Sequence, residues 1–569
     1  MFICYIRTRL LGAKRMFVLP VILLLLQYDW VYAEHPQLTT PSGSIKGSLL
    51  TSRLGKTIYA FRGIRYAEPP VGELRFKPPV AVETWNGTYD ATKDGSICPQ
   101  PTAGDPVSED CLMLNVYSTK LPKGKDNPKR PVIVYILPGA FYSTTSVSYW
   151  AGPQYFMDQD IVFVTFNYRL GSLGFLATGD KESPGNYGMK DQVVVLKWVQ
   201  KNIASFGGDP DSVTLLGYSA GSWSIIFHMV SPMSKGLFHK GIAMSGSPVG
   251  GWPIPTGQLD IAKKQARLVG CPDDTSKNIV NCLKTKSAKE LGDSFFGFRE
   301  FGYDPILIWS PVIEPEVGQE RFITDNPIRL IMNGHLQHIP FITGQTKDEF
   351  SYSAFNVVNN ETLTKEMNED WDRIAPISFI YERGTKQSLK VSRAIRKFYL
   401  DDKPISKSNR EALGKIYSDS IETFPINRAV KLMAQYNKKP VYYYRFSFQG
   451  RYSHFYLPGT NNTVPYGVVH HDDLIYLFYI QRLFPRFNAT SPRPEIDMVQ
   501  TLTTLHTNFA KTGNPTPTRN PTLDNVKWDT FNLDTQKYLD IGEKLVMKER
   551  MYEDRVKLWE DLYPLSMYN

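Results

Sequence analysis

The sequence has few cysteines and no block of like charge. Only five of its 569 residues are cysteine, and no Cys-x-x-Cys pair occurs, which argues against a zinc site. Lysine and arginine number 65 against 56 acidic residues, so the formal net charge is +9, but both signs are spread along the chain. Such a mildly basic surface predicts no nucleic-acid partner.

The chain also lacks internal repeats, low-complexity tracts and, after residue 33, any apolar run long enough to span a bilayer. Its hydrophobic content is 42% and its aromatic content is 13%, values typical of a folded protein with a large core. The composition therefore favours a globular protein over a disordered or repetitive one.

The first 33 residues have the three parts of a secretory signal: a basic start, an apolar middle and a small residue at the cleavage position. The apolar middle is residues 16–26, and Ala33 ends the segment. A membrane anchor is the alternative, but this run is short for a bilayer. We predict a signal peptide at 1–33, secretion without a membrane anchor, and a single domain at 34–569.

Loss of that segment would remove Cys4 and leave four cysteines, which allow three pairings. They lie as two near pairs, Cys98 with Cys111 and Cys271 with Cys282. In an oxidising compartment each pair would close a loop of about a dozen residues and stabilise the fold by roughly 3 kcal/mol. The sequence also contains four Asn-x-Ser/Thr glycosylation acceptors, which fit secretion: Asn86, Asn360, Asn461 and Asn488.

A parallel α/β pattern occupies the first half of the chain. Residues 130–137, 161–168 and 212–217 are apolar, β-branched runs suited to strands buried on both faces. Residues 188–206 have one broad apolar helical face, and they separate the second strand from the third. This order predicts a parallel sheet with flanking helices.

Ser219 lies in the sequence Gly-Tyr-Ser-Ala-Gly, between Gly217 and Gly221. Gly-x-Ser-x-Gly alone is common by chance, but here the serine follows a predicted strand and precedes a predicted helix. A nucleophile elbow needs that position, because its sharp turn lifts the hydroxyl above the sheet and needs small neighbours. The helix behind Ser219 would aim backbone N–H groups at a developing oxyanion.

A serine nucleophile needs a histidine base and an acid that orients it. Eight histidines follow Ser219, and pattern alone does not choose among them. His228 would lie in the helix after Ser219 and is expected to be a packing residue. His454 and His470 both lie in loop-like regions, so both remain candidates.

Several long blocks in the right order resemble the type-B carboxylesterase family, the cholinesterase-like branch of the α/β hydrolases. They include residues 63–79, 108–117, 167–176, 206–221 and 509–517. The segment 310–350 is most similar to secreted insect members such as antennal, integument and venom esterases. The resemblance implies an α/β-hydrolase fold with a mostly parallel central sheet, flanking helices and helical C-terminal elaborations.

The resemblance also assigns the site. It implies Ser219 as nucleophile, His470 as base and Glu349 as the orienting acid, with Asp348 as the alternative acid. The oxyanion donors would be the N–H groups of three residues, and a tryptophan would line the acyl pocket: Gly139, Ala140, Ala220 and Trp252. The implied substrate is a small-molecule ester, and the implied reaction needs no cofactor and no metal.

Three residues depart from the family pattern. Pro138 precedes the predicted oxyanion donors and would stiffen their loop. Phe350 replaces the glycine that usually follows the acid; at a positive φ it would cost about 1–2 kcal/mol or change the turn. Tyr218 replaces the glutamate common before the serine in cholinesterases. In cholinesterases the corresponding loop carries a tryptophan that holds the choline cation. The loop from Cys98 to Cys111 lacks a tryptophan, so choline esters are not the expected substrates.

Two functions are compatible with these features. The first is a secreted carboxylic ester hydrolase that forms an acyl-enzyme on Ser219, since all three triad types are present in order. The second is a catalytically weak or inactive esterase-like protein used for adhesion or binding. Such proteins usually lose a triad residue, which this sequence does not, and we therefore expect an esterase.

Overall fold

The computed structural model describes residues 35–101 and 106–568; the predicted signal peptide lies outside them. The strands are β1 (Gln37–Thr40), β2 (Gly43–Lys46), β3 (Ser48–Thr51), β4 (Thr57–Arg65), β5 (Thr88–Asp90), β6 (Met113–Ser118), β7 (Arg130–Ile136), β8 (Val162–Phe166), β9 (Gly208–Tyr218), β10 (Lys240–Met244), β11 (Phe341–Thr346), β12 (Val441–Phe446), β13 (Lys537–Ile541) and β14 (Leu545–Glu549).

The α-helices are α1 (Gly171–Phe175), α2 (Tyr187–Asn202), α3 (Ala220–Val230), α4 (Leu259–Leu268), α5 (Ser276–Leu283), α6 (Ala288–Asp293), α7 (Pro327–Met332), α8 (Ser353–Val358), α9 (Glu361–Glu369), α10 (Trp371–Ser378), α11 (Lys386–Leu400), α12 (Arg410–Ser418), α13 (Phe424–Tyr436), α14 (Arg493–Thr512) and α15 (Glu553–Leu562). The predicted strands and the two predicted helices of the first half are all present. The helix expected to reach residue 206 ends at Asn202 and continues as a 3₁₀ turn, Ile203–Phe206, which closes at Gly207 with φ 82°.

An eleven-stranded sheet forms the centre of the described residues, in the order β14-β13-β12-β11-β10-β9-β7-β8-β6-β4-β3. Every neighbouring pair from β8 to β13 is parallel, and the remaining pairs are antiparallel. A separate small sheet joins β1, β2 and β5. The predicted mostly parallel sheet is thus confirmed, and the carboxyl ends of its parallel strands share one edge.

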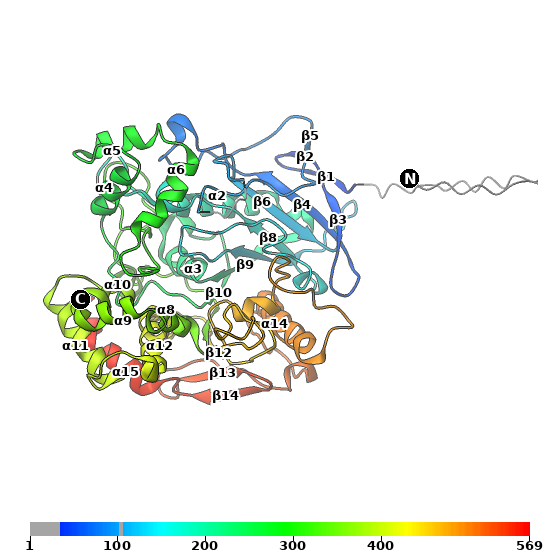
Figure 1. Cartoon of the computed structure of the whole chain (residues 1–569). Coiled ribbons are helices and arrows are strands. Elements are labelled where there is room, and N and C mark those ends of the chain that lie inside the picture. The colour runs from blue at the N-terminus through cyan, green and yellow to red at the C-terminus, as the bar shows by residue number, and fades with distance from the viewer. Residues whose placement is uncertain (1–34, 102–105, 569) are drawn as a thin grey trace, which may run out of the picture. The chain divides into compact units, whose positions relative to one another are not determined.

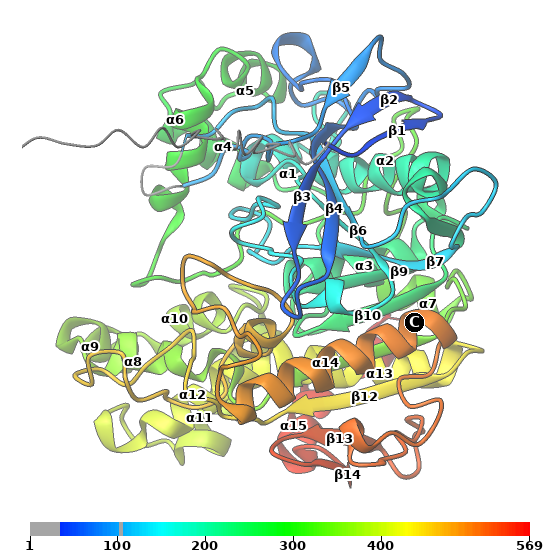
Figure 2. The same ribbon diagram turned by 90° about the vertical axis from the view of Figure 1, so that its right-hand side faces the viewer.

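The two faces of the sheet belong to different hydrophobic clusters. Along β7, Val132 and Val134 pack into the cluster that includes residues of α2 and α3. Ile133 and Tyr135 point the other way, into the cluster that includes residues of α14. This alternation follows from the two-residue period of a strand, and burial on both faces explains why the strands read as continuous apolar runs. Figure 2 shows α14 running alongside β12, and Phe509 on α14 packs edge-on against Tyr442 on β12.

The helices that follow β11 form a third cluster, built by α8 to α12 and α15 around buried side chains such as Trp371 and Trp559. In Figure 1 these yellow-green and red helices gather apart from the green group α4 to α6. The expected helical elaborations of the second half are therefore a packed layer with its own apolar core.

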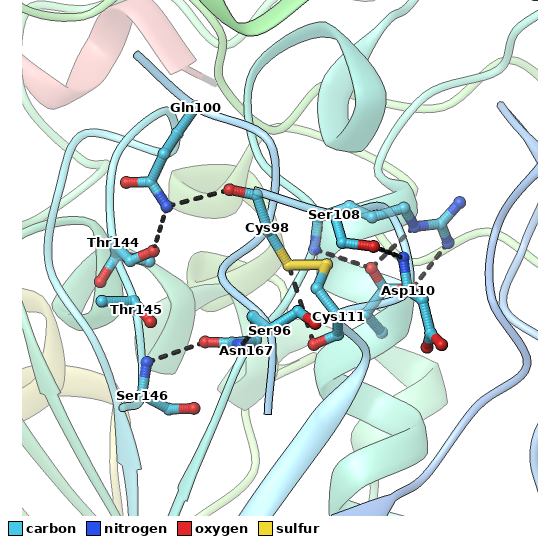
Figure 3. Close-up of a disulfide and its surroundings, with 12 residues drawn as sticks. Ser96, Cys98, Gln100, Ser108, Asp110, Cys111, Thr144, Thr145, Ser146 and Asn167 are labelled. Atoms are coloured by element: carbon cyan, nitrogen blue, oxygen red, sulfur yellow. Dashed lines mark hydrogen bonds and ion pairs between the residues drawn. A yellow bond between two sulfur atoms is a disulfide. The ribbon is translucent and has the colours of Figure 1, made fainter. Parts of the chain in front are cut away.

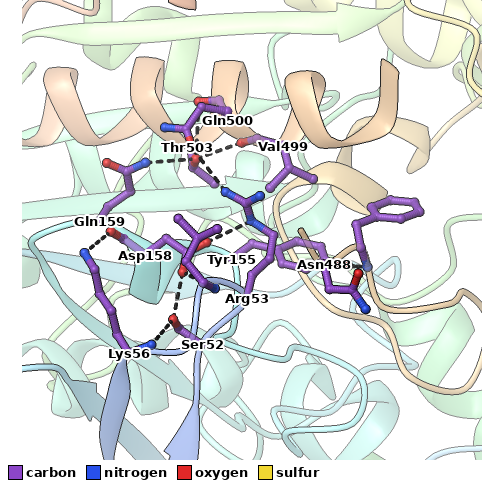
Figure 4. A network of polar contacts seen from close by, with 12 residues as sticks. Ser52, Arg53, Lys56, Tyr155, Asp158, Gln159, Asn488, Val499, Gln500 and Thr503 are labelled. Carbon is purple, nitrogen blue, oxygen red and sulfur yellow. Dashed lines mark hydrogen bonds and ion pairs between the residues drawn. The ribbon is translucent and has the colours of Figure 1, made fainter. Parts of the chain in front are cut away.

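A buried polar network ties the N-terminal strands to α14. Asp158 accepts hydrogen bonds from Ser52 Oγ at 2.7 Å, Arg53 Nε at 2.8 Å and Leu54 N at 2.9 Å (Figure 4). Arg53 Nη2 also reaches Gln500 Oε1 on α14 at 3.1 Å. Because both members of the ion pair are almost fully buried, each needs the other to satisfy its charge.

The structure contains both disulfides, Cys98–Cys111 and Cys271–Cys282. Next to the first, Gln100 Nε2 donates to the carbonyl of Cys98 at 3.1 Å and to that of Thr144 at 2.7 Å (Figure 3). The disulfide loop is thereby fastened to the segment that follows the predicted oxyanion residues.

Candidate active site

Ser219 occupies the sharp turn between β9 and α3, as the sequence predicts. Its backbone has φ 55° and ψ −117°, a strained conformation for a residue with a side chain. The turn is held because Ser219 N donates to the carbonyl of Met244 on the neighbouring strand β10 at 2.8 Å. The strain presents the hydroxyl at the carboxyl edge of the sheet.

The two glycines around this serine are required by space. A Cβ on Gly217 would lie 2.2 Å from the carbonyl oxygen of Gly221. A Cβ on Gly221 would lie 2.0 Å from the carbonyl oxygen of Ile136. These distances are far below contact, so the Gly-x-Ser-x-Gly spacing reflects the close approach of α3 to the ends of β7 and β9.

His470 and Glu349 are paired by a short hydrogen bond. Glu349 begins a 3₁₀ helix, Glu349–Tyr352, directly after β11, and its Oε2 lies 2.6 Å from His470 Nδ1. The other carboxylate oxygen accepts from Thr346 N at 2.7 Å. Both side chains are buried, at 0% and 3% exposed. The carboxylate is therefore fixed at both oxygens, and it fixes the ring orientation of His470.

Phe350 causes no left-handed strain, because the turn it occupies is a 3₁₀ helix. It is not among the described non-glycine residues with positive φ. Its ring stacks on the imidazole of His470 with centroids 4.2 Å apart and an angle of 30°. Phenylalanine in place of the family's glycine thus packs against one face of the His470 ring.

The alternative candidates for the acid and the base make other contacts and take no part in the pair of His470 and Glu349. Asp348 Oδ2 accepts from Val468 N at 2.9 Å and does not bond His470. His454 is held by Asp472, which accepts from its backbone N at 2.8 Å. His228 is buried in α3, between Ser234 Oγ at 2.7 Å and Gln192 Oε1 at 2.9 Å, and burial lowers its pKa to about 3. It is a packing residue, in keeping with the sequence.

The predicted oxyanion loop has an unusual backbone. Gly139, Ala140 and Phe141 all have positive φ, at 116°, 48° and 61°. A Cβ at residue 139 would lie 1.6 Å from the carbonyl oxygen of Ser143, which explains the glycine after Pro138. No hydrogen bond within residues 106–568 uses the N–H of Gly139 or Ala140. Ala220 begins α3, so its N–H has no acceptor inside the helix.

Ser219, His470, Gly139, Ala140 and Ala220 all line one cavity of about 150 Å³. Most of its other walls are apolar or aromatic: Phe141, Trp223, Ile306, Leu307, Phe350, Ile380 and Ile421. A cavity of about 370 Å³ shares walls such as Tyr142 and Tyr352 with it, and one of about 410 Å³ shares Gly139 and His471. The two larger cavities therefore adjoin the cavity that Ser219 and His470 line.

The predicted acyl-pocket tryptophan, Trp252, is not among the residues that line this cavity. Its indole packs instead between two hydrophobic clusters. The tryptophan that lines the cavity is Trp223, four residues after Ser219 and 7% exposed. Its place one helical turn beyond the serine was the available signal, because residues at i and i+4 of a helix share a face.

The predicted glycosylation acceptors Asn86, Asn360, Asn461 and Asn488 are all exposed. Two of them have local bonds: Asn360 caps α9, and Asn488 Oδ1 accepts from Thr490 N at 2.9 Å. Within the described ranges, no helix is long and apolar enough to cross a membrane, and no cluster of His, Cys, Asp or Glu could hold a metal ion.

The sheet, the strained serine turn and the buried histidine–glutamate pair together define an α/β hydrolase. A family model described as the Carboxylesterase family matches residues 34–559. The chain is 36% identical to venom carboxylesterase-6 of Apis mellifera, over 89% of this chain and 90% of that protein. It is 34% identical to the juvenile hormone esterase of Tribolium castaneum, over 90% and 89% of the two chains.

Among solved structures, the juvenile hormone esterase of Manduca sexta with OTFP covalently attached superposes with a TM-score of 0.81. The sequence identity is 28%, and the match covers 93% of this chain and 100% of that one. This protein belongs to the carboxylesterase family and is a carboxylic ester hydrolase. The resemblance, the fold class and the enzyme class predicted from the sequence are confirmed.

Proposed function

We propose that this protein is a secreted serine esterase that cleaves small-molecule esters through an acyl-enzyme on Ser219. The observation that carries the proposal is the 2.6 Å contact between His470 Nδ1 and Glu349 Oε2, in a cavity that His470 shares with the strained Ser219. With Nδ1 committed to the carboxylate, Nε2 is the nitrogen left to act as base.

In this mechanism His470 takes the Ser219 proton as the hydroxyl oxygen attacks the ester carbonyl. The N–H groups of Gly139, Ala140 and Ala220 bind the tetrahedral oxyanion; one such donor is worth about a hundred- to thousandfold in rate. His470 then protonates the leaving alcohol. Water, activated by the same imidazole, attacks the acyl-enzyme and releases the acid, while Glu349 stabilises the imidazolium.

Secretion is the second part of the proposal. It is supported by the signal-like residues 1–33 and by two disulfides, which persist in oxidising compartments. It also fits four exposed glycosylation acceptors. The mature protein would be one domain that begins at residue 34. N-terminal amino-acid sequencing of the protein recovered from the medium of a eukaryotic culture tests this. A protein retained in the cells with residues 1–33 intact would contradict it.

The catalytic part is tested by labelling the protein with a fluorophosphonate and locating the adduct. We expect the label on Ser219 and hydrolysis of a short-chain p-nitrophenyl ester that is lost in Ser219→Ala. Turnover that survives this substitution would refute the nucleophile. A folded wild-type protein that is neither labelled nor hydrolytic but binds cells would instead favour the adhesion function.

A further inference from the structure

Glu422 places a carboxyl group in the wall of the catalytic cavity. It lies in a π-helical turn, Asp419–Thr423, inserted between α12 and α13. Such turns inside α-helices occur frequently at functional sites. The residue is 3% exposed and lines the same cavity as Ser219 and His470. The reaction proposed for Ser219 has no step for this acid.

The carboxyl of Glu422 has no partner in the described part of the chain. Its Oε2 is fully buried without a hydrogen bond, and no hydrogen bond or ion pair reaches Oε1. Asp419, at the start of the same turn, shows how a structural acid is satisfied there: it binds Tyr399 Oη at 2.6 Å and Arg555 Nη2 at 2.5 Å. A buried carboxyl without a partner destabilises a fold, so its presence in the wall of a cavity calls for a functional explanation.

The surroundings decide the form in which this carboxyl acts. Burial, and to a smaller extent the negative charge of Glu349, raises the pKa of Glu422 well above its ordinary value. The protonated acid is therefore favoured, and its O–H is a hydrogen-bond donor. Neighbouring walls such as Ile380 and Ile421 are apolar, so a donor here has few competing acceptors.

We propose that Glu422 is a specificity-determining residue that donates a hydrogen bond to a second oxygen of the substrate, beyond the ester that is cleaved. The substrates so selected are esters that carry an ether, ketone, hydroxyl or further ester oxygen along one arm. This inference rests on the proposed catalytic function of Ser219 and His470. It adds a hydrogen-bond donor to a cavity whose other walls are mostly apolar or aromatic.

A structural role and a substrate-binding role for Glu422 predict opposite effects of its removal on stability. If the carboxyl served packing, Glu422→Leu would destabilise the protein. If the carboxyl is retained for substrate, the same substitution removes an unpaired polar group and raises the unfolding temperature while it removes selectivity. Glu422→Gln keeps a neutral donor of similar shape and is expected to keep most of the selectivity.

The experiment compares kcat/KM for matched pairs of esters in which one chain CH₂ is replaced by oxygen. One series varies the acyl arm as p-nitrophenyl esters; the other varies the alcohol arm as acetate esters, with the oxygen moved one position at a time. In the wild type we expect about a tenfold preference for one oxygen position, the value of one hydrogen bond. The preference should fall below about twofold in Glu422→Leu.

Ile421→Val is the matched control, because residue 421 lines the same cavity with an apolar side chain. It should change the rates for both members of a pair alike and leave their ratio unchanged. The proposal is overturned if the wild type shows no preference at any position on either arm, or if Glu422→Leu retains it. A protein that is not labelled at Ser219 would instead overturn the proposed function, so the two failures are distinguishable.

Discussion

Tyr218 Oη accepts a hydrogen bond from the backbone N–H of His471 at 2.7 Å. The contact joins the residue before the proposed nucleophile to the residue after the proposed base. The Tyr218 ring lies 5.0 Å from both imidazoles of this loop, measured between centroids. His471 itself is left-handed, with φ 80°, so the bond holds a strained backbone in place. Tyr218 therefore positions His470 relative to Ser219.

The first prediction concerns this contact. Tyr218→Phe leaves the N–H of His471 without an acceptor and is expected to lower kcat about tenfold with a smaller change in KM, because misplacement acts on the chemical step. Steady-state kinetics with a p-nitrophenyl ester measures both constants. Tyr444→Phe is the control: its hydroxyl reaches Asp473 at 3.4 Å and makes no hydrogen bond to His470 or His471. Equal losses in both variants would contradict the positioning role.

The second prediction separates two adjacent aspartates. Burial and the charge of Glu349 raise the pKa of Asp473 well above its ordinary value, so the neutral acid is favoured. Asp473→Asn should therefore keep kcat within about twofold. Because the folded pKa is raised, the wild type loses stability as pH rises above about 4, where the unfolded state ionises, and the variant should lack this loss.

Asp472 behaves differently, because its carboxylate accepts from His454 N at 2.8 Å, Val469 N at 2.9 Å and Ser453 Oγ at 2.8 Å. Asp472→Asn loses one acceptor oxygen and should cost about 1–3 kcal/mol of stability. Urea unfolding of both variants at pH 5 and pH 8 makes the comparison. A neutral effect at residue 472, or a large one at residue 473, would contradict these assignments.

The third prediction is a loss of stability in acid that depends on His228. Its folded pKa is about 3, below the ordinary 6.5, because it is buried. As pH falls from about 6.5 towards 3, the unfolded state binds a proton that the folded state excludes, and stability falls by about 1.4 kcal/mol per pH unit. His228→Gln should reduce this slope, whereas the exposed His335, changed to Gln, should not. Unfolding free energies between pH 7.5 and 4.5 provide the test.

The fourth prediction tests the buried pair in Figure 4. Asp158→Ala leaves the Arg53 guanidinium buried without its counter-ion and should cost about 3–5 kcal/mol. Adding Arg53→Met should restore part of this loss, because it removes the unpaired charge. The exposed pair of Lys557 and Asp561 is the control; Asp561→Asn should cost less than about 1 kcal/mol. Full additivity of the two core substitutions would show that the pair is not coupled.

Local sequence pattern was enough to predict the central strands and the turn that contains Ser219. Strands β7, β8 and β9 are buried on both faces, so their sequences are continuous apolar runs that can be read without a structure. The strand–serine–helix order placed Ser219 correctly because the elbow is a local feature. The end of α2 was misplaced by a few residues, since the 3₁₀ turn that follows it continues the same apolar face.

The rest of the site depends on segments far apart in the chain. Choosing His470 over His454 and Glu349 over Asp348 needed the family resemblance, because neither choice has a local signal. Ser219 follows β9, Glu349 follows β11, and His470 lies in the loop that follows β12, strands that the sheet order brings to one edge. Trp223 could have been proposed from its place one helical turn after Ser219. Glu422 entered the site through packing, although an acid within the mostly apolar residues 421–426 was a visible irregularity.

By itself, the sequence determined strands β7, β8 and β9, the serine turn and the spacing of its glycines, because each follows from burial pattern or steric contact between near neighbours. Tertiary structure alone decided which distant acid meets which histidine and where an unpaired carboxyl lines the cavity. Those relationships arise when parallel strands align their ends, and no pattern within a single segment encodes that alignment.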